Sequence, residues 1–219
     1  FLVMAGYRDT VVRSVLLDRL AVTAAFCRER RYDIYVDRRG YVGYPEAFHR
    51  YRLINPAIYG AQVAQLPSIH DLNGLAALLV EEGNPALWSN LEAVTAYVLH
   101  PAYHALDDGY GVVWGGGRRY YTLGWDAKMP GFHGFAPPTR PSPLLTRLIT
   151  IARIPAARAH PWFRSALAHL ETFRTPRGTF RFPPEYLTDR EGYWVLGYGL
   201  GVGENRRSPR WREIESTLW

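Results

Sequence analysis

Cysteine is nearly absent from this sequence. Cys27 is the one cysteine in 219 residues, so the chain can form neither an internal disulfide nor a cysteine-based zinc site. The residue falls within an apolar pattern at helical spacing, which indicates a small buried side chain. The fold therefore has no cross-link and no cysteine-bound metal within the chain to hold it together.

Long apolar runs are missing as well. No stretch approaches the ~20 apolar residues that cross a bilayer, and no signal peptide is visible. These absences predict a soluble, cytoplasmic protein without a membrane span. The sequence begins at Phe1 inside apolar sequence and ends at Trp219 inside a helical pattern, so we expect a portion of a longer protein.

The composition is that of a globular protein rich in aromatic residues. Apolar residues make up 47% of the chain and charged residues 21%, which argues against disorder. The length is sufficient to bury a real core. The seven tryptophans and fifteen tyrosines are expected either between helices or on the wall of a pocket.

The net charge of +6 comes mostly from arginine. Many of the arginines form scattered doublets, namely Arg30–Arg31, Arg38–Arg39, Arg118–Arg119 and Arg206–Arg207. Such doublets are usually solvated or paired with carboxylates, and no recognised nucleic-acid module accompanies them. Nucleic acid is therefore the least favoured partner, and a single arginine-rich face would be needed to raise it.

Apolar residues at helical spacing predict a mainly all-α chain. Helices are expected from Asp9 or Thr10 to Arg28, from Ser68 to a stop at Gly83, from Pro85 to His100, from Leu144 to Ile154, and from Pro161 onward. The residues expected to be buried between them are Leu16, Leu20, Leu91, Val98, Trp162, Leu167 and Leu170. One short β-hairpin is predicted, with strands at Tyr32–Val36 and Val42–Tyr44 joined through Arg39–Gly40.

A repeated plan runs through the chain. Three units, at about 9–83, 84–155 and 156–219, each contain a helix, a tip with glycine and aromatic residues, and a return helix. The tips read RRGYVGYP, DGYGVVWGG and PRGTFRFPP. A repeat of roughly 50–70 residues predicts a single helical-repeat domain with long Gly/Pro-rich loops.

This plan resembles the α/α-toroid of the terpenoid cyclase and protein prenyltransferase superfamily, in which outer and inner helices alternate around a ring. The residues that carry the resemblance are Asp108–Gly111 with Trp114, Arg177–Phe180 with Phe182, and the returns Tyr120–Trp125 and Tyr193–Tyr198. The resemblance implies a partial toroid of helical hairpins covering about half a ring. It does not imply the family's activities, because the Asp-rich acid motif, the zinc ligand set and the Gln of the Gln–Trp motif are absent from the sequence.

Two aspartates are the candidates for catalysis. Asp71 follows His70, and Asp126 follows Trp125, each on a predicted return helix. A carboxylate in an apolar, aromatic wall has a raised pKa, which a general acid requires. The structural alternative is that Asp71 caps its helix and that Asp126 pairs with Lys128 or an arginine.

Aromatic residues on the predicted return helices are the candidates for substrate binding. The set comprises His70, Tyr120, Tyr121, Trp125, Tyr193, Trp194 and Tyr198. A wall of tyrosine and tryptophan can hold a sugar by stacking, a cation by its π faces, or an isoprenoid by area. We expect these residues to converge on one cavity, whereas the alternative is that they are ordinary core.

Cofactor and metal patterns are incomplete. The glycines of GYGLGVG (197–203) do not have the spacing of a dinucleotide fingerprint, and no strand is expected before them. His100, His104 and Asp107 have ligand-like spacing, but Pro101 interrupts the segment. The sequence therefore predicts neither a cofactor nor a metal.

Three functions follow from these observations. The first is a cavity that binds a small apolar or carbohydrate-like molecule, with Asp71 or Asp126 as an acid. The second is a non-catalytic scaffold that binds another protein, and the third is nucleic-acid binding through arginine. A concave pocket holding the aromatic set would separate the first from the second.

Overall fold

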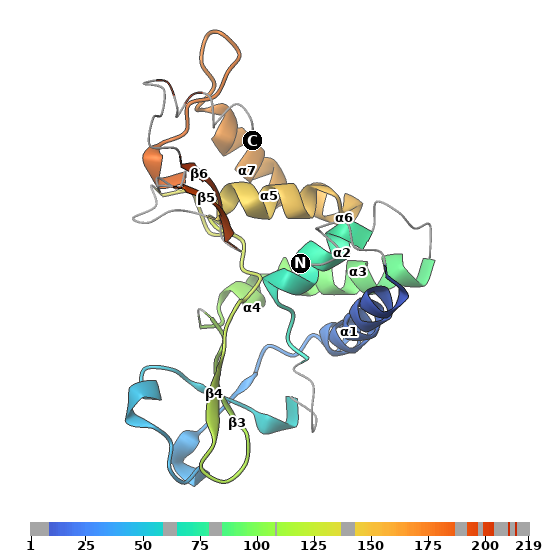
Figure 1. Cartoon of the computed structure of the whole chain (residues 1–219), viewed down its shortest axis with the longest axis vertical. Helices are drawn as coiled ribbons and strands as arrows, with labels where there is room; N and C mark the ends of the chain where they lie inside the picture. Colours follow the sequence, from blue (N-terminus) through green and yellow to red (C-terminus); the bar gives the residue numbers. More distant parts are fainter. Residues whose placement is uncertain are drawn as a thin grey trace. The chain divides into compact units, whose positions relative to one another are not determined.

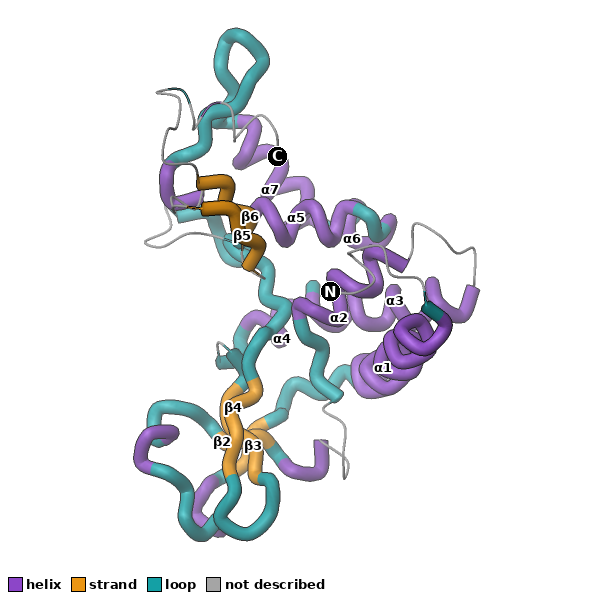
Figure 2. Tube along the Cα trace, viewed as in Figure 1, coloured by secondary structure: helices purple, strands orange, loops and turns teal. Residues whose placement is uncertain are grey.

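The computed structural model describes residues 9–58, 65–78, 85–107, 109–136, 143–186, 192–196, 199–203, 210 and 213. The chain divides into two compact units, Phe1–Lys128 and Met129–Trp219. Figure 1 labels the helices and most of the strands, and Figure 2 separates helix, strand and loop by colour.

Helices form one half of the first unit. They are α1 (Thr10–Arg28), α2 (Ile69–Leu78), α3 (Pro85–Val98) and the short α4 (Pro101–His104). Helix α1 begins where the Asp9 side chain accepts a hydrogen bond from the Val11 N–H at 2.8 Å, which satisfies one of the donors left open at a helix start. It packs against α3 and α2. The buried side chains include Leu20, Ala24, Cys27, Leu72, Leu75, Leu91, Val94 and Val98.

A four-stranded mixed sheet forms the other half of this unit. Its strands are β1 (Tyr35–Val36), β2 (Leu53–Ile54), β3 (Gly111–Trp114) and β4 (Tyr120–Leu123), in that order across the sheet. Strand β2 pairs antiparallel with β1 and parallel with β3, and β3 and β4 form an antiparallel hairpin. Short 3₁₀ helices at Arg38–Gly40, Glu46–Phe48 and Pro56–Ile58 lie in the connections before and after β2.

The two faces of this sheet differ in what covers them. Paired residues share a face, so the pairs Val36–Leu53, Leu53–Val112 and Tyr120–Trp114 lie on one side. On this inner face a small core of Leu53, Val112 and Tyr120 packs against Val36, Tyr41, Tyr44, Phe48 and Tyr51. The opposite face, called the outer face below, carries Tyr35, Ile54, Val113, Tyr121 and Leu123. Ile54 is buried, Tyr121 is 54% exposed, and the other three are half-buried.

The second unit has its own core. Its elements are α5 (Leu144–Ala152), α6 (Pro155–Arg158), α7 (Pro161–Glu171), the 3₁₀ turn Pro184–Tyr186, and a hairpin of β5 (Gly192–Leu196) and β6 (Gly199–Gly203). Buried residues of this core include Leu144, Leu145, Leu148, Ile151, Trp162, Phe163, Ala166 and Phe182. The Trp162 indole N–H donates to the Pro130 carbonyl at 2.9 Å, so the ring is fixed as well as buried.

The mixed sheet makes the protein α+β, and the prediction of a mainly all-α, toroid-like array is wrong. The segments predicted as return helices at Tyr120–Trp125 and Tyr193–Tyr198 contain strands β4 and β5 instead. Both are rich in the aromatic and β-branched residues that suit a pleated, half-buried surface. The hairpin at Tyr32–Tyr44 is wrong in its pairing, because β1 pairs with β2 and not with Val42–Tyr44.

The burial predictions were correct for most of the helical core. Leu20, Leu91, Val98 and Trp162 are buried. Leu16 and Leu170 are half-buried, and Leu167 is 46% exposed. The apolar stripe of α7 is thus wider than the surface that its neighbours cover. Leu167 and Leu170 line an open apolar pocket of about 260 Å³, together with Leu145, Leu148 and Phe182.

None of the helices in the described part of the chain has the length and apolar character needed to span a membrane.

Candidate functional site

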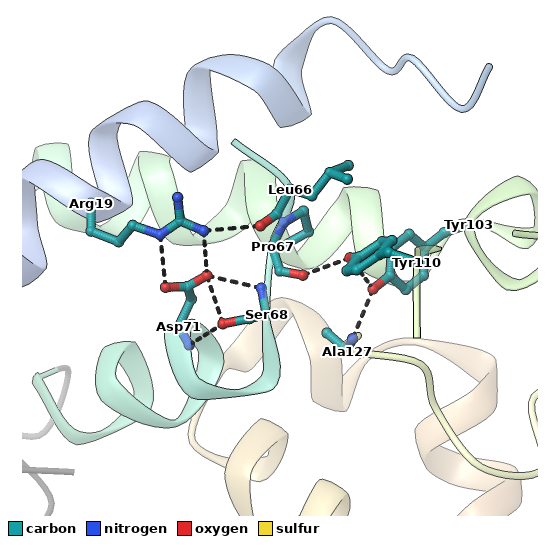
Figure 3. A network of polar contacts seen from close by, with 8 residues as sticks. All are labelled: Arg19, Leu66, Pro67, Ser68, Asp71, Tyr103, Tyr110 and Ala127. Carbon is teal, nitrogen blue, oxygen red and sulfur yellow. Dashed lines mark hydrogen bonds and ion pairs between the residues drawn. The ribbon is translucent and has the colours of Figure 1, made fainter. Parts of the chain in front are cut away.

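Asp71 closes the start of α2 with a reciprocal cap, shown in Figure 3. Its Oδ2 accepts hydrogen bonds from the Ser68 backbone N–H at 2.8 Å and the Ser68 hydroxyl at 2.9 Å. The Ser68 hydroxyl in turn accepts from the Asp71 N–H at 3.1 Å. This pairing is a capping box, which satisfies two backbone donors at once.

Arg19 of α1 completes the environment of Asp71. Its Nε and Nη2 donate to Oδ1 and Oδ2 at 3.0 and 2.9 Å, and Nη2 also donates to the Leu66 carbonyl at 2.9 Å. Both carboxylate oxygens therefore accept charge-assisted hydrogen bonds in a bidentate geometry. The arrangement ties α1 to the start of α2 and engages both oxygens of Asp71 in structural contacts.

A chain of hydroxyl groups lies beside this cap (Figure 3). The Tyr110 hydroxyl is 2.6 Å from the Pro67 carbonyl and 2.5 Å from the Tyr103 hydroxyl, which accepts from the Ala127 N–H at 2.8 Å. A carbonyl can only accept, so Tyr110 donates to Pro67 and Tyr103 donates to Tyr110. Burial, followed by the neighbouring Tyr103, raises the pKa of Tyr110 well above its ordinary value, which keeps the donor protonated.

Asp126 also has structural contacts. Its Oδ2 accepts from the Gly109 N–H at 2.6 Å, and its Oδ1 accepts from the Lys128 N–H at 3.0 Å. The Lys128 ammonium donates to the Leu106 carbonyl. Asp126 therefore joins the segment that enters β3 to the segment that follows β4. The catalytic role predicted for Asp71 and Asp126 remains a prediction. The contacts of Asp71 favour its predicted capping role, and those described for Asp126 are with backbone N–H groups.

The aromatic residues predicted to bind substrate lie in different parts of the first unit. His70 and Trp125 meet, with ring centroids 4.9 Å apart. Tyr120 points to the inner face of the sheet, where its hydroxyl donates to the Val42 carbonyl at 3.0 Å, and Tyr121 points to the outer face. Tyr120, Tyr121 and Trp125 line neither the apolar pocket beside α7 nor the polar pocket formed by Arg50, Tyr51, Arg52, Asp107, Tyr110 and Gly111.

The remaining members of the set belong to the second unit. Tyr193 and Trp194 lie on β5, and Tyr198 falls outside the described residues. The predicted convergence of this group with Tyr120 and Tyr121 therefore stays a prediction.

The two glycine–aromatic tips of the first unit pack on each other. Tyr41 meets Trp114 edge-on at 5.4 Å, and Tyr44 meets Tyr120 at 5.2 Å. Gly43 lies so close to the Arg118 side chain that an added Cβ would be 3.0 Å from its Cγ. Segments predicted as equivalent tips of two repeats are thus parts of one structure, the sheet with its connections.

This structure is strongly basic. We define the basic sheet lobe as residues 35–58 and 109–124, whose two acidic residues are Asp37 and Glu46. Its arginines are Arg38, Arg39, Arg50, Arg52, Arg118 and Arg119. All six are exposed, and the Arg39 side chain is 91% exposed. The lobe therefore gathers a positive charge that the scattered doublets of the sequence did not reveal.

Arginine and tyrosine lie together on the outer face of the sheet. The Arg52 guanidinium stands over the Tyr35 ring, 4.0 Å from its centroid, a favourable cation–π geometry. Across β3, the ring of Tyr121 is half exposed on the same face. Arg119 precedes β4, and its carbonyl accepts from the Gly115 N–H at 2.8 Å, so it lies at the end of the β3–β4 hairpin.

A polar pocket of about 360 Å³ adjoins this face where β2 and β3 begin. It is lined by Arg50, Tyr51, Arg52, Asp107, Tyr110 and Gly111. Gly111 has φ 146°, and an added Cβ would lie 2.4 Å from the Arg52 carbonyl oxygen. Only glycine allows β3 to approach β2 this closely.

Asp107 is positioned in this pocket through its backbone. Its N–H donates to the Tyr35 hydroxyl at 3.1 Å. Its Oδ2 is 4.0 Å from the Arg52 Nε, and the side chain is 46% exposed. Burial, followed by the Asp107 charge, raises the pKa of Tyr35 to about 12. The pocket thus combines two arginines with an accessible carboxylate.

The histidines with ligand-like spacing have other partners. The His100 Nδ1 accepts from the Ala102 N–H at 3.1 Å, and the His104 Nε2 is 3.0 Å from the Val98 carbonyl. A search of the described residues found no group of three or more His, Cys, Asp or Glu side chains arranged to hold a metal ion.

Sequence reasoning missed the basic sheet lobe because its parts are distant in the chain. The signal that was available is the alternation Arg50–Tyr51–Arg52 before β2, with the doublets Arg38–Arg39 in the first tip and Arg118–Arg119 just after the second. Comparison of the chain with models of known protein families, with curated proteins and with solved structures found no match.

Proposed function

We propose that the first unit binds single-stranded nucleic acid on the outer face of its mixed sheet. The observation that carries this proposal is the Arg52 guanidinium over the Tyr35 ring and the half-exposed Tyr121 on that face, in a lobe that has six exposed arginines. Arginine neutralises phosphates, and aromatic rings accept stacked bases of any sequence. Proteins that bind single strands combine these two elements in a groove or on a sheet face.

The other predicted functions have less support. A cavity for a small apolar or carbohydrate-like molecule needs the aromatic set around one opening, and Tyr120, Tyr121 and Trp125 point in different directions. An acid at Asp71 would have to give up a bidentate bond to Arg19. Nucleic-acid binding is supported by the exposed arginines of the basic sheet lobe.

Binding is tested by fluorescence anisotropy with a labelled twelve-nucleotide single strand at several salt concentrations. The logarithm of the association constant should fall linearly with that of salt, with a slope of about −0.7 per neutralised phosphate. Arg119→Ala should lower the steepness of this slope by about 0.7. Arg158→Ala, which removes the same charge from an exposed site on the second unit, is the matched control and should leave the slope unchanged.

Stacking is tested at Tyr121. Tyr121→Ala should weaken binding by about 1–3 kcal/mol, the contribution of one stacked base. Tyr121→Phe keeps the ring and should bind like the wild type. Loss of affinity in both variants would point to the hydroxyl group, and no loss in either would place the bases elsewhere.

A further inference from the structure

We propose that the pocket at the start of β2 and β3 takes one ribonucleotide of the bound strand, and that Asp107 selects RNA over DNA. The inference rests on the proposed function. The pocket and the outer face share Arg52, which lines the pocket and stands over Tyr35. A strand that crosses the outer face can therefore continue into the pocket without leaving the protein surface.

The pocket has the size and the cations for a nucleotide. Its volume of about 360 Å³ is within the usual range of small-molecule sites. Arg50 is steadied by the neighbouring tyrosine, because its Nη2 donates to the Tyr51 hydroxyl at 2.6 Å and its guanidinium stands 4.7 Å from that ring centroid. A guanidinium has five N–H donors, so Arg50 and Arg52 can each bind a phosphate oxygen while keeping these contacts.

Asp107 gives the pocket its selectivity. A carboxylate repels phosphate, so its presence in a pocket that Arg50 and Arg52 also line fits a ligand that brings a hydrogen-bond donor as well as a phosphate. Its Oδ2 is ion-paired with the Arg52 Nε at 4.0 Å, a distance too long for a hydrogen bond, and its backbone N–H donates to the Tyr35 hydroxyl. The ribose 2′-hydroxyl is a donor that RNA has and DNA lacks. With the phosphate at Arg50 and Arg52, this hydroxyl donates to Asp107.

The experiment compares three labelled strands on the whole chain by fluorescence anisotropy: twelve uridines, twelve deoxythymidines, and twelve 2′-O-methyluridines. The methylated strand keeps the ribose shape but has no 2′ donor. The wild type should bind the uridine strand about tenfold more tightly than either other strand, the effect of one hydrogen bond to a charged group. Asp107→Ala should reduce this ratio to about one.

Two variants separate selectivity from general charge effects. Glu46→Ala removes one negative charge from the basic sheet lobe, outside the pocket. It should strengthen the binding of all three nucleic-acid strands equally. Arg50→Ala should weaken the binding of all three strands by a similar factor, because every strand carries phosphates. Circular dichroism should show the wild-type spectrum for each variant, since the three side chains are exposed.

The outcomes distinguish the two proposals. If the wild type binds the three strands equally and Tyr121→Ala weakens them all, the outer face binds nucleic acid and the proposed selectivity is wrong. If Asp107→Ala keeps the preference for uridine, the 2′-hydroxyl is read elsewhere and the pocket assignment is overturned. If no strand binds the wild type, the proposed function itself fails.

Discussion

Both carboxylate oxygens of Asp71 accept hydrogen bonds from groups whose own positions are fixed. The Ser68 groups belong to the start of α2, and the Arg19 guanidinium is also held by the Leu66 carbonyl. The pair is largely buried, with side-chain exposures of 23% for Arg19 and 10% for Asp71. In such a place the loss of one partner leaves the other charge without compensation.

Asp71→Asn should therefore destabilise the first unit by about 3–5 kcal/mol. The amide keeps the shape of the side chain, but only its oxygen can accept a hydrogen bond. The NH₂ group that replaces the second oxygen is a donor and cannot accept from the Arg19 guanidinium. Urea unfolding, followed by tryptophan fluorescence, measures the change in free energy. The matched control is Asp18→Asn, at an exposed position of α1 next to Arg19. It should change the free energy of unfolding by less than about 0.5 kcal/mol. Equal stabilities of Asp71→Asn and wild type would show that the bidentate pair contributes nothing.

Tyr110 illustrates how a buried polar residue can be satisfied entirely within the protein. Its hydroxyl donates to the Pro67 carbonyl and accepts from the Tyr103 hydroxyl. The residue directly before β3 is thereby joined to the segment that leads into α2. The residue has φ 59°, a conformation that costs energy for a non-glycine residue. The hydroxyl chain and complete burial hold it there.

At the scale of elements, α4 and α7 begin in the same way. Each starts with a His–Pro pair, His100–Pro101 and His160–Pro161, in which the proline occupies the first helical turn. In α7 the His160 Nδ1 accepts from the Trp162 N–H at 3.2 Å. A ring nitrogen can accept this bond only while it is unprotonated, so the cap depends on pH.

The second unit should therefore lose stability on acidification. Burial and then Arg164 lower the pKa of His160 below its ordinary value of 6.5, and burial lowers that of His169. Below pH 6.5 the unfolded chain takes up protons before the folded one, so the free energy of unfolding falls with decreasing pH and is highest above 6.5. The measurement is urea unfolding at pH 7.5 and at pH 5.5.

Substitution at His160 identifies the source of the pH effect. His160→Asn retains a capping acceptor that does not titrate, so the difference in stability between the two pH values should shrink. His160→Ala loses the cap and should be less stable at both. A pH difference as large in His160→Asn as in the wild type would assign the effect to other groups.

Most helix starts could be predicted from the sequence because their signals are local. Asp9, Ser68 and Pro161 each mark a helix start within a few residues. The sheet could not be predicted, because β2 is two residues long and pairs with β3 far along the chain, Leu53 beside Val112. The basic sheet lobe follows from this pairing, so it was equally hidden. The cap at Asp71 could be predicted as an alternative, since Ser68 stands three residues before it.

At the scale of the whole molecule, the two units differ in where their described arginine side chains lie. In the first unit the described arginines include the exposed group on the sheet and the paired Arg19. In the second unit Arg147 is buried on α5, whereas Arg153, Arg158 and Arg164 are exposed around the helices. The net charge of +6 favours encounters with polyanions in general. The binding of a single strand proposed for the first unit would also use the exposed Tyr121, which the basic sheet lobe has together with its arginines.

Each unit buries its own apolar side chains, so the chain should unfold in two transitions. Leu91 is fully buried against the helices of the first unit, and Trp162 is 4% exposed in the core of the second. Leu91→Ala should cost about 2–5 kcal/mol and Trp162→Ala about 3–5 kcal/mol, through lost burial and the cavity left behind. Differential scanning calorimetry should show Leu91→Ala lowering the midpoint of one transition and Trp162→Ala that of the other. Added single-stranded RNA should raise only the midpoint that Leu91→Ala lowers, because a ligand stabilises the unit that binds it. One cooperative transition, lowered by both substitutions, would contradict independent cores.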